Sequence, residues 1–178
     1  GLEQRFTRTL WLDMQGFYRL YVDRLRPDVD PTVRLRSDGE GYSAGGEFTL
    51  RHDPVGRFYG WLAYTFAYTR VKDGAEGVLR RTDVDQSHKL SLLAGFKLTP
   101  DLSLNTRWRY WRGGAYSDLP DQLLDADRGQ ASFEPNLAND MRLSDGHELD
   151  LRLDAWWRFE RWRLLSYLQV SNVYQNTR

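Results

Sequence analysis

The chain has no cysteine, only three lysines and no long apolar run. The missing cysteines exclude a disulfide scaffold, a thiolate metal site and a cysteine nucleophile. The longest segment free of Asp, Glu, Lys and Arg covers residues 164–177 and is half polar, whereas a membrane-spanning helix needs about 20 mostly apolar residues. The 25 basic and 25 acidic side chains cancel, so net charge gives no argument for a nucleic-acid partner.

The chain also begins without Met and without an apolar leader, as Gly1-Leu2-Glu3-Gln4-Arg5. We therefore expect no signal peptide in it, and we expect a mature or trimmed chain or a piece of a longer one. Its 178 residues suit one domain. An aromatic content of 14% is too high for a disordered chain.

Hydrophobic residues recur at every second position, which is the period of a β-strand. The sharpest case follows His147, where Leu149, Leu151 and Leu153 alternate with charged residues. Such runs last 9–12 residues. A soluble strand has about 5–6 residues, and a tilted strand that crosses a bilayer has about 9–11. The pattern predicts seven strands, at residues 9–21, 42–52, 58–70, 88–98, 102–110, 147–157 and 162–174.

Short and long connections between these strands alternate strictly. Residues 53–57, 99–101 and 158–161 form the short links, and residues 22–41, 71–87 and 113–146 form the long ones. Loops above about 12–15 residues are uncommon in a compact soluble domain, whereas outer-membrane barrels have short periplasmic turns and longer extracellular loops. The motif His-x-Leu-x-Leu, at His88 and 59 residues later at His147, also supports repeated hairpins.

These patterns predict an all-β fold in which the chain is part of an antiparallel up-and-down transmembrane β-barrel in the bacterial outer membrane. If the leucines after His147 face lipid, the charged residues between them must face the barrel interior, because a charge on the lipid face costs about 2–4 kcal/mol at the bilayer midplane. The residues predicted to face this lumen are Glu47, Arg51, Lys89, Asn105, Arg107, Arg109, Asp150, Arg152 and Asp154.

Aromatic residues gather near the predicted strand ends, where they would form girdles at the lipid headgroups. They are Tyr59, Trp61, Trp108, Tyr110, Trp111, Trp156, Trp157, Phe159 and Trp162. An alternative is that these rings pack one face of a soluble β-sandwich or a lipocalin-like binding protein. That alternative requires a second sheet to shield Leu149, Leu151 and Leu153.

Few residues suggest chemistry. His88 and His147 occupy equivalent positions at the starts of two strands. This placement fits either a pair of metal ligands or two polar residues that end the strands toward water, and the second interpretation is favoured. His52 is expected near a turn. The long link is acidic, and its residues Asp121, Asp125 and Asp127 predict an extracellular acidic loop. Its Asp-x-Asp-x-Gly sequence resembles the start of a calcium loop without the closing glutamate, so a solvated loop is favoured over calcium. No nucleophile elbow or phosphate loop is present, and we expect no enzyme and no resident cofactor.

Taken in order, several segments resemble the C-terminal part of the barrel of TonB-dependent outer-membrane transporters. The first, GEGYSAGGEFTLR at residues 39–51, is similar to a glycine-rich strand start with a Gly-x-Glu-like signature in that family. The other segments are residues 60–65, 85–90, 107–114, 147–152 and 170–174. The resemblance extends over nearly the whole chain, and it depends on the order and spacing of motifs that are individually loose.

The resemblance implies a barrel of about 22 strands with an N-terminal plug, which imports a scarce ligand with energy relayed by TonB. No segment here matches the plug or the TonB-contacting segment, so residues 1–178 are expected to be one segment of the barrel domain. The implied partners are outer-membrane lipid, the TonB system, and further strands and a plug from the same polypeptide or another subunit. A siderophore, vitamin, saccharide or peptide ligand all remain open.

Two alternatives to transport remain at this point. The chain is a structural barrel subunit or membrane anchor within a larger surface complex, or it is the soluble binding protein described above. A soluble binder predicts a protein that stays folded without detergent.

Overall fold

The computed structural model describes residues 1–27, 35–74, 77–82, 85–116, 124–125, 130–131 and 141–174. For Pro27 and for residues 124–125 and 130–131, only the backbone is described. All regular elements within these ranges are β-strands, and none of these residues belongs to a helix with the length and hydrophobicity of a membrane span. The expectation of an all-β antiparallel fold is therefore confirmed.

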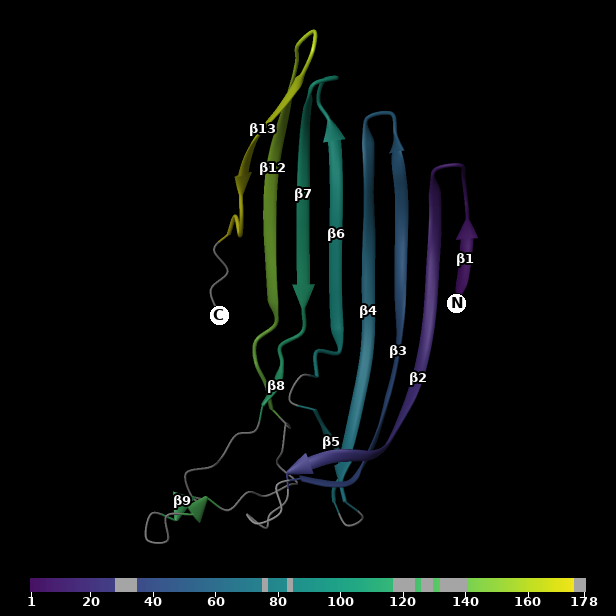
Figure 1. Ribbon diagram of the computed structural model, residues 1–178, viewed down its shortest axis with the longest axis vertical. Coiled ribbons are helices and arrows are strands. Elements are labelled where there is room, and N and C mark those ends of the chain that lie inside the picture. The colour runs from purple at the N-terminus through teal and green to yellow at the C-terminus, as the bar shows by residue number, and fades with distance from the viewer. Residues whose placement is uncertain are drawn as a thin grey trace.

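One large sheet contains nine strands, eight of which follow a continuous antiparallel path from β1 to β13 (Figure 1). These eight are β1 (Leu2–Arg5), β2 (Leu10–Pro27), β3 (Leu35–Val55), β4 (Phe58–Asp73), β6 (His88–Lys97), β7 (Leu102–Trp111), β12 (Gly146–Arg158) and β13 (Arg163–Val170). The ninth, β5 (Arg80–Arg81), pairs with the end of β4. The edge strands β1 and β13 are not neighbours in this order, so the sheet is open.

Two small two-stranded sheets lie among the connections. Strand β8 (Ala115–Tyr116) pairs with β11 (Met141–Arg142), and β9 (Leu124–Asp125) pairs with β10 (Gln130–Ala131). Short turns join β1 to β2, β3 to β4, β6 to β7 and β12 to β13 at one end of the sheet, and the long connections lie at the other end (Figure 1). We call these the turn end and the loop end.

The seven predicted strands are present as β2, β3, β4, β6, β7, β12 and β13, but the predicted bounds and count need correction. The short edge strand β1 escaped detection because four residues are too few to show a period. The expected long link at residues 22–41 is wrong, because β2 continues to Pro27 and β3 begins at Leu35. Backbone pairing continues there past a bulge at Asp23, which has a positive φ of 53°, although the side chains no longer alternate.

The register places directly opposed residues on the same side of the sheet. On one side, which we call the apolar face, a row runs through Leu12, Leu50, Leu62, Leu92, Trp108 and Leu149. On the opposite side, which we call the polar face, a row runs through Trp11, Arg51, Trp61, Leu93, Arg107 and Asp150. Each strand of the main path therefore contributes alternate residues to two chemically different surfaces.

Neither face is covered by a second layer in the described part of the chain. There, the buried hydrophobic residues are Val71 and Ala115 alone, and no large side chain is fully buried. The accessible surface is 13147 Å², against about 9,000 Å² for a compact folded protein of this mass. The described residues therefore form no hydrophobic core of the usual kind, and the second sheet that a soluble sandwich requires is not among them.

Candidate functional site

All nine residues predicted to face a lumen lie on the polar face. Glu47 and Lys89 both oppose Thr65 from its two sides, while Arg51 belongs to the row of Arg107 and Asp150. The remaining members, Asn105, Arg109, Arg152 and Asp154, follow at alternate positions of β7 and β12. The structure thus brings the nine together on one surface; that this surface lines a lumen stays a prediction.

Ion pairs connect β7 and β12 across this face. Arg107 donates from Nε and Nη2 to Oδ2 of Asp150, at 3.0 and 2.5 Å. The next pair along, Arg109 with Glu148, belongs to the same alternation, and the prediction missed Glu148 although its period marks it equally well. Asp154 accepts from Arg152 at 2.7 Å and from Asn105 at 2.6 Å. The face is therefore charged but internally neutralised over these strands.

The Asp150 carboxylate is the most enclosed of these groups, with a side-chain exposure of 8%. Besides Arg107, it accepts a bond of 2.9 Å from the backbone N–H of Asn172. Asn172 has a positive φ of 50° and follows the end of β13, and Val173 then donates its N–H to the carbonyl of Leu149. Asp150 thus anchors a local break in pairing, which is why β13 ends at Val170 and not at the predicted residue 174.

Four predicted girdle residues lie on the polar face instead of the apolar one. They are Tyr59, Trp61, Trp111 and Trp156. Two of them cover glycines of the neighbouring strand: Tyr59 lies over Gly95, and Trp111 lies over Gly146. A ring over a glycine restores packing that the missing side chain would have supplied, and this is the local reason why Tyr59 and Trp111 lie on the polar face. Nothing in the structure explains the same placement of Trp61 and Trp156.

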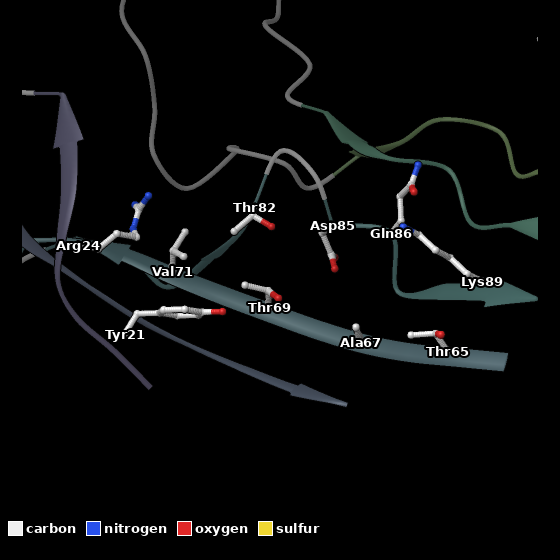
Figure 2. A pocket seen from close by; sticks show the side chains of 10 residues that line it. All are labelled: Tyr21, Arg24, Thr65, Ala67, Thr69, Val71, Thr82, Asp85, Gln86 and Lys89. Atoms are coloured by element: carbon white, nitrogen blue, oxygen red, sulfur yellow. The ribbon is translucent and has the colours of Figure 1, made fainter. Parts of the chain in front are cut away.

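A hollow of about 390 Å³ lies on the polar face near the loop end. Its floor is Thr65, Ala67, Thr69 and Val71 of β4, and Asp85 points into it from the opposite side (Figure 2). A second hollow of about 510 Å³ continues toward β7 and shares Thr65, Gln86 and Lys89 with the first. The small side chains on β4 leave this space, and Lys89 lies where the two hollows meet.

The connections at the loop end are tied together by Arg142. Its guanidinium pairs with Asp85 at 2.8 Å and donates to the hydroxyl of Ser87 at 3.1 Å and to the carbonyl of Gly113 at 3.0 Å. The Asp85 side chain is only 2% exposed. This contact joins β11 to the segment before β6, so that two connections far apart in sequence meet above the hollow.

Asp145 forms a second anchor, just before β12. The Tyr110 hydroxyl donates to its Oδ2 at 2.5 Å and the Gly113 N–H donates to its Oδ1 at 3.0 Å. These two bonds, the hydroxyl first, hold the pKa of the Asp145 carboxyl below its usual value.

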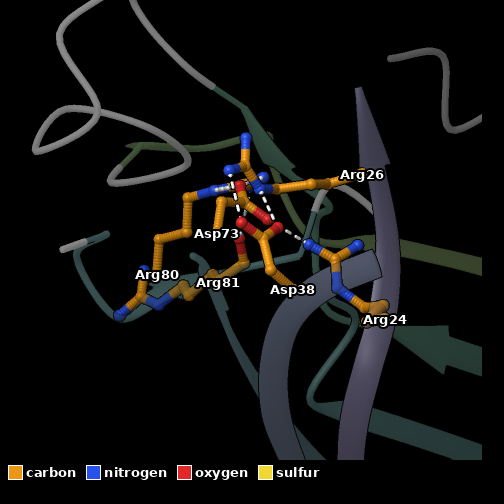
Figure 3. A network of polar contacts seen from close by, with 6 residues as sticks. All are labelled: Arg24, Arg26, Asp38, Asp73, Arg80 and Arg81. Atoms are coloured by element: carbon orange, nitrogen blue, oxygen red, sulfur yellow. Dashed lines mark hydrogen bonds and ion pairs between the residues drawn. The ribbon is translucent and has the colours of Figure 1, made fainter. Parts of the chain in front are cut away.

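A network of arginines and aspartates lies at the loop end of β2, β3 and β4 (Figure 3). Arg26 forms a two-pronged contact with Asp38, at 2.6 and 2.9 Å, and this contact is the main cause of a lowered pKa for Asp38. Arg24 pairs with Asp73, which also accepts from Arg80 at 2.7 Å. These ion pairs hold the extended ends of three strands together where the apolar alternation has stopped.

The histidines lie in aromatic surroundings. The ring of His88 is hydrogen-bonded to the hydroxyl of Tyr64 at 2.8 Å, and His147 lies edge-on to Tyr174. His52 lies 5.5 Å from Phe58, centroid to centroid, close to the turn after β3, as expected. The described residues contain no group of three or more His, Asp or Glu placed to bind a metal.

The structure does not test the prediction of an acidic extracellular loop. Asp121 and Asp127 lie outside the described residues, and for Asp125 only the backbone in β9 is described. The solvated acidic loop therefore stays a prediction, and calcium binding stays its less favoured alternative. No protein-family model, curated protein sequence or solved structure matches the chain.

Proposed function

We propose that the chain is a segment of an outer-membrane β-barrel of the TonB-dependent transporter type, whose polar face lines the interior and takes part in ligand uptake. The observation that carries the membrane assignment is the apolar face. From the row of Phe58 to the row of Tyr68, the main path has no Asp, Glu, Lys or Arg on this face.

The size of this uncharged band fits a membrane. Phe58 and Tyr68 are ten residues apart on β4, about 33 Å along the strand. With the usual barrel tilt of about 35–45°, this distance gives a band of about 25 Å, the height of the apolar belt of outer-membrane barrels. Many of its side chains are exposed, for example Leu168 at 68% and Tyr18 at 64%, so water is a poor surrounding for this surface.

Aromatic rings occur at both ends of the band, as in a lipid-facing barrel wall. At the loop end, Tyr18, Tyr42 and Tyr68 follow one another across three strands, with ring centroids 6.1 and 6.4 Å apart. At the turn end, Phe159 and Trp162 stack at 3.8 Å. Both groups would lie at headgroup level if the leucine rows lie in the hydrocarbon.

The transporter part of the proposal is supported by two features of the chain. The sequence motifs resemble the C-terminal barrel strands of TonB-dependent transporters, and the polar face offers adjoining hollows of about 390 and 510 Å³ near the loop end. The sheet has two unpaired edges, so a closed barrel needs further strands from the same polypeptide or another subunit.

A cysteine scan along residues 147–157 tests the membrane assignment, and it is clean because the chain has no cysteine of its own. In lipid vesicles, labels at Leu149, Leu151 and Leu153 should be protected from a water-soluble thiol reagent, while labels at Asp150 and Arg152 should react. Uniform reactivity along the segment, or a protein folded without detergent, would favour the soluble binder instead.

The mass and N-terminal sequence of the polypeptide isolated from membranes test the transporter assignment. A chain several times heavier than 20.9 kDa, with a plug upstream and uptake that stops when TonB is removed, is the expected result. A membrane-inserted polypeptide without plug and without TonB-dependent uptake would make the chain a structural barrel subunit.

A further inference from the structure

We infer that the ligand taken up is a short saccharide with a carboxylate group, which stacks on Trp111 and is bound by Lys89 in the second hollow of the polar face. The inference rests on the proposed function, because it names the ligand class for that same surface. The hollow of about 510 Å³ is within the range of small-molecule sites, about 300–1,000 Å³. It offers three features that an acidic saccharide uses together: a flat ring, neutral polar groups and one cation.

Trp111 provides the flat ring. Its indole lies over Gly146, so one side of the ring rests on the sheet and the other is turned toward the hollow that Trp111 lines. The face of an aromatic ring carries partial negative charge, whereas the C–H groups on one side of a pyranose carry partial positive charge. A sugar ring therefore packs flat on an indole while its hydroxyl groups stay at the rim, where polar side chains can reach them.

Neutral polar groups line the same hollow as this ring. They are the side chains of Thr65, Gln86 and Ser91, of which Thr65 and Gln86 also line the first hollow (Figure 2). None of the three makes a side-chain hydrogen bond to another described residue. A hydroxyl or an amide both donates and accepts, as each sugar hydroxyl does, so these side chains suit a ligand that carries many hydroxyl groups.

Lys89 is the one charged residue lining the two hollows that has no ion pair among the described residues. The others are each paired: Arg24 with Asp73, Asp85 with Arg142, and Arg109 with Glu148. Glu47, which opposes Thr65 from its other side, lines neither hollow. Lys89 is also exposed, so its ammonium group can bind an anion without breaking an existing contact. A single cation of this kind favours a ligand with one carboxylate at the site.

The strands beneath the hollows favour a saccharide over a peptide. Extended peptides commonly bind a sheet through backbone hydrogen bonds at an exposed edge. Strands β4 and β6, which both contribute residues to the hollows, are each paired on both sides, so neither offers a free edge. Recognition at this place must therefore use side chains, and those available are hydroxyl groups, an amide, a ring and an amine.

The test measures the binding of two probes to the polypeptide isolated from membranes in detergent, by isothermal titration calorimetry. The probes are trigalacturonate, which is an acidic saccharide, and maltotriose, which is a neutral saccharide with the same number of rings. The wild type should bind trigalacturonate roughly 10-fold more tightly, because a hydrogen bond to a charged group contributes more than a neutral one. Lys89→Gln should reduce the affinity for trigalacturonate to the level of maltotriose.

Lys97→Gln is the matched control for Lys89→Gln. Lys97 is exposed, lies on the polar face of the same strand β6 and lines neither hollow, so this variant should bind both probes like the wild type. Trp111→Leu should weaken both probes by roughly 5-fold. Trp156→Leu, which removes an exposed indole of the polar face outside the two hollows, should weaken neither. Because Lys89 is exposed, Lys89→Gln tests the site even if Trp111→Leu does not fold.

Three results would overturn the inference: no binding of trigalacturonate by the wild type, equal affinities of the wild type and Lys89→Gln for it, or an equal loss in the Lys97→Gln control. If uptake depends on TonB while neither saccharide binds, the ligand class alone fails. If trigalacturonate binds as expected but the polypeptide has no plug and no TonB-dependent uptake, the transporter assignment fails and the saccharide site remains.

Discussion

At the scale of single residues, close cross-strand contacts decide which side chains this sheet tolerates. Gly95 and Gly146 lie under the rings of Tyr59 and Trp111, and the hydroxyl of Tyr59 also donates to Asn105 at 2.5 Å. The rings lie flat on the sheet only because no Cβ is present beneath them. Glycine here is required by the neighbouring strand, not by a turn.

Replacement of Gly95 by alanine should therefore destabilise the protein by about 1–3 kcal/mol, the usual cost of inserting a methyl group into a filled space. The added Cβ would meet the Tyr59 ring and displace it from Asn105. Gly114→Ala is the control, because a Cβ there meets no atom within 4 Å. Urea unfolding in detergent micelles measures both variants, and equal unfolding midpoints would contradict this account.

The loop-end anchor at Asp145 should respond to pH. Its carboxyl has a lowered pKa, so the bonds from Tyr110 and Gly113 stabilise the folded state fully above the unfolded pKa of about 3.9. That contribution is lost as the pH falls through the lower folded value. Hydrogen exchange of the Gly113 amide should therefore show protection that decreases only in this acidic window.

Tyr110→Phe supplies the control for the pH experiment. Without the hydroxyl, the pKa of Asp145 should return toward its usual value, and protection of the Gly113 amide should be lost at a higher pH than in the wild type. Superimposable pH profiles for the two proteins would show that the hydroxyl does not stabilise the charged carboxylate.

At the scale of elements, the longest strands pass through two chemically different regions. Strands β2, β3 and β4 have 18, 21 and 16 residues, and only their middle parts alternate between apolar and polar. Beyond the bulge at Asp23, ion pairs such as Arg26 with Asp38 replace the leucine rows. The backbone ladder thus continues beyond the point where the alternation of apolar and polar side chains stops.

Neighbouring positions on β6 separate these two faces in one experiment. Leu92→Arg places a charge in the middle of the apolar face, whereas Ser91→Arg places the same charge on the polar face. In vesicles, the first variant should lose about 2–4 kcal/mol of unfolding free energy, and the second should lose little. Similar losses for both would mean that the two faces do not differ in their surroundings.

At the scale of the whole molecule, the absence of a second layer in the described residues is the most informative feature. A single sheet with 13147 Å² of accessible surface gains little from burial within itself, so its stability in this form must come from what covers its faces. A bilayer on the apolar face and a plug, ligand or water on the polar face meet that requirement together. A soluble partner for the apolar face would need to be as long as the sheet itself.

The strands and their facing are largely determined by the sequence alone. A period of two is a local property of the sequence, and it places Leu149 and Asp150 on opposite sides of the sheet. Because directly opposed residues of paired strands lie on the same side, this assignment of faces then holds for every neighbouring strand. For this reason all nine residues that were predicted to face a lumen lie together on the polar face. Residues with ambiguous chemistry, such as Tyr59 and Trp111, were misassigned because an aromatic ring is compatible with either face, and only the glycine opposite decides.

Tertiary structure alone decided what happens at the loop end. The contact of Arg142 with Asp85, the gathering of Arg24, Arg26 and Arg80 around two aspartates, and the hollows beside Lys89 join residues from different connections. No period in the sequence relates these residues, because they are brought together by the order of strands in the sheet. Alternation is encoded residue by residue, whereas contacts between connections exist only after the strands have paired.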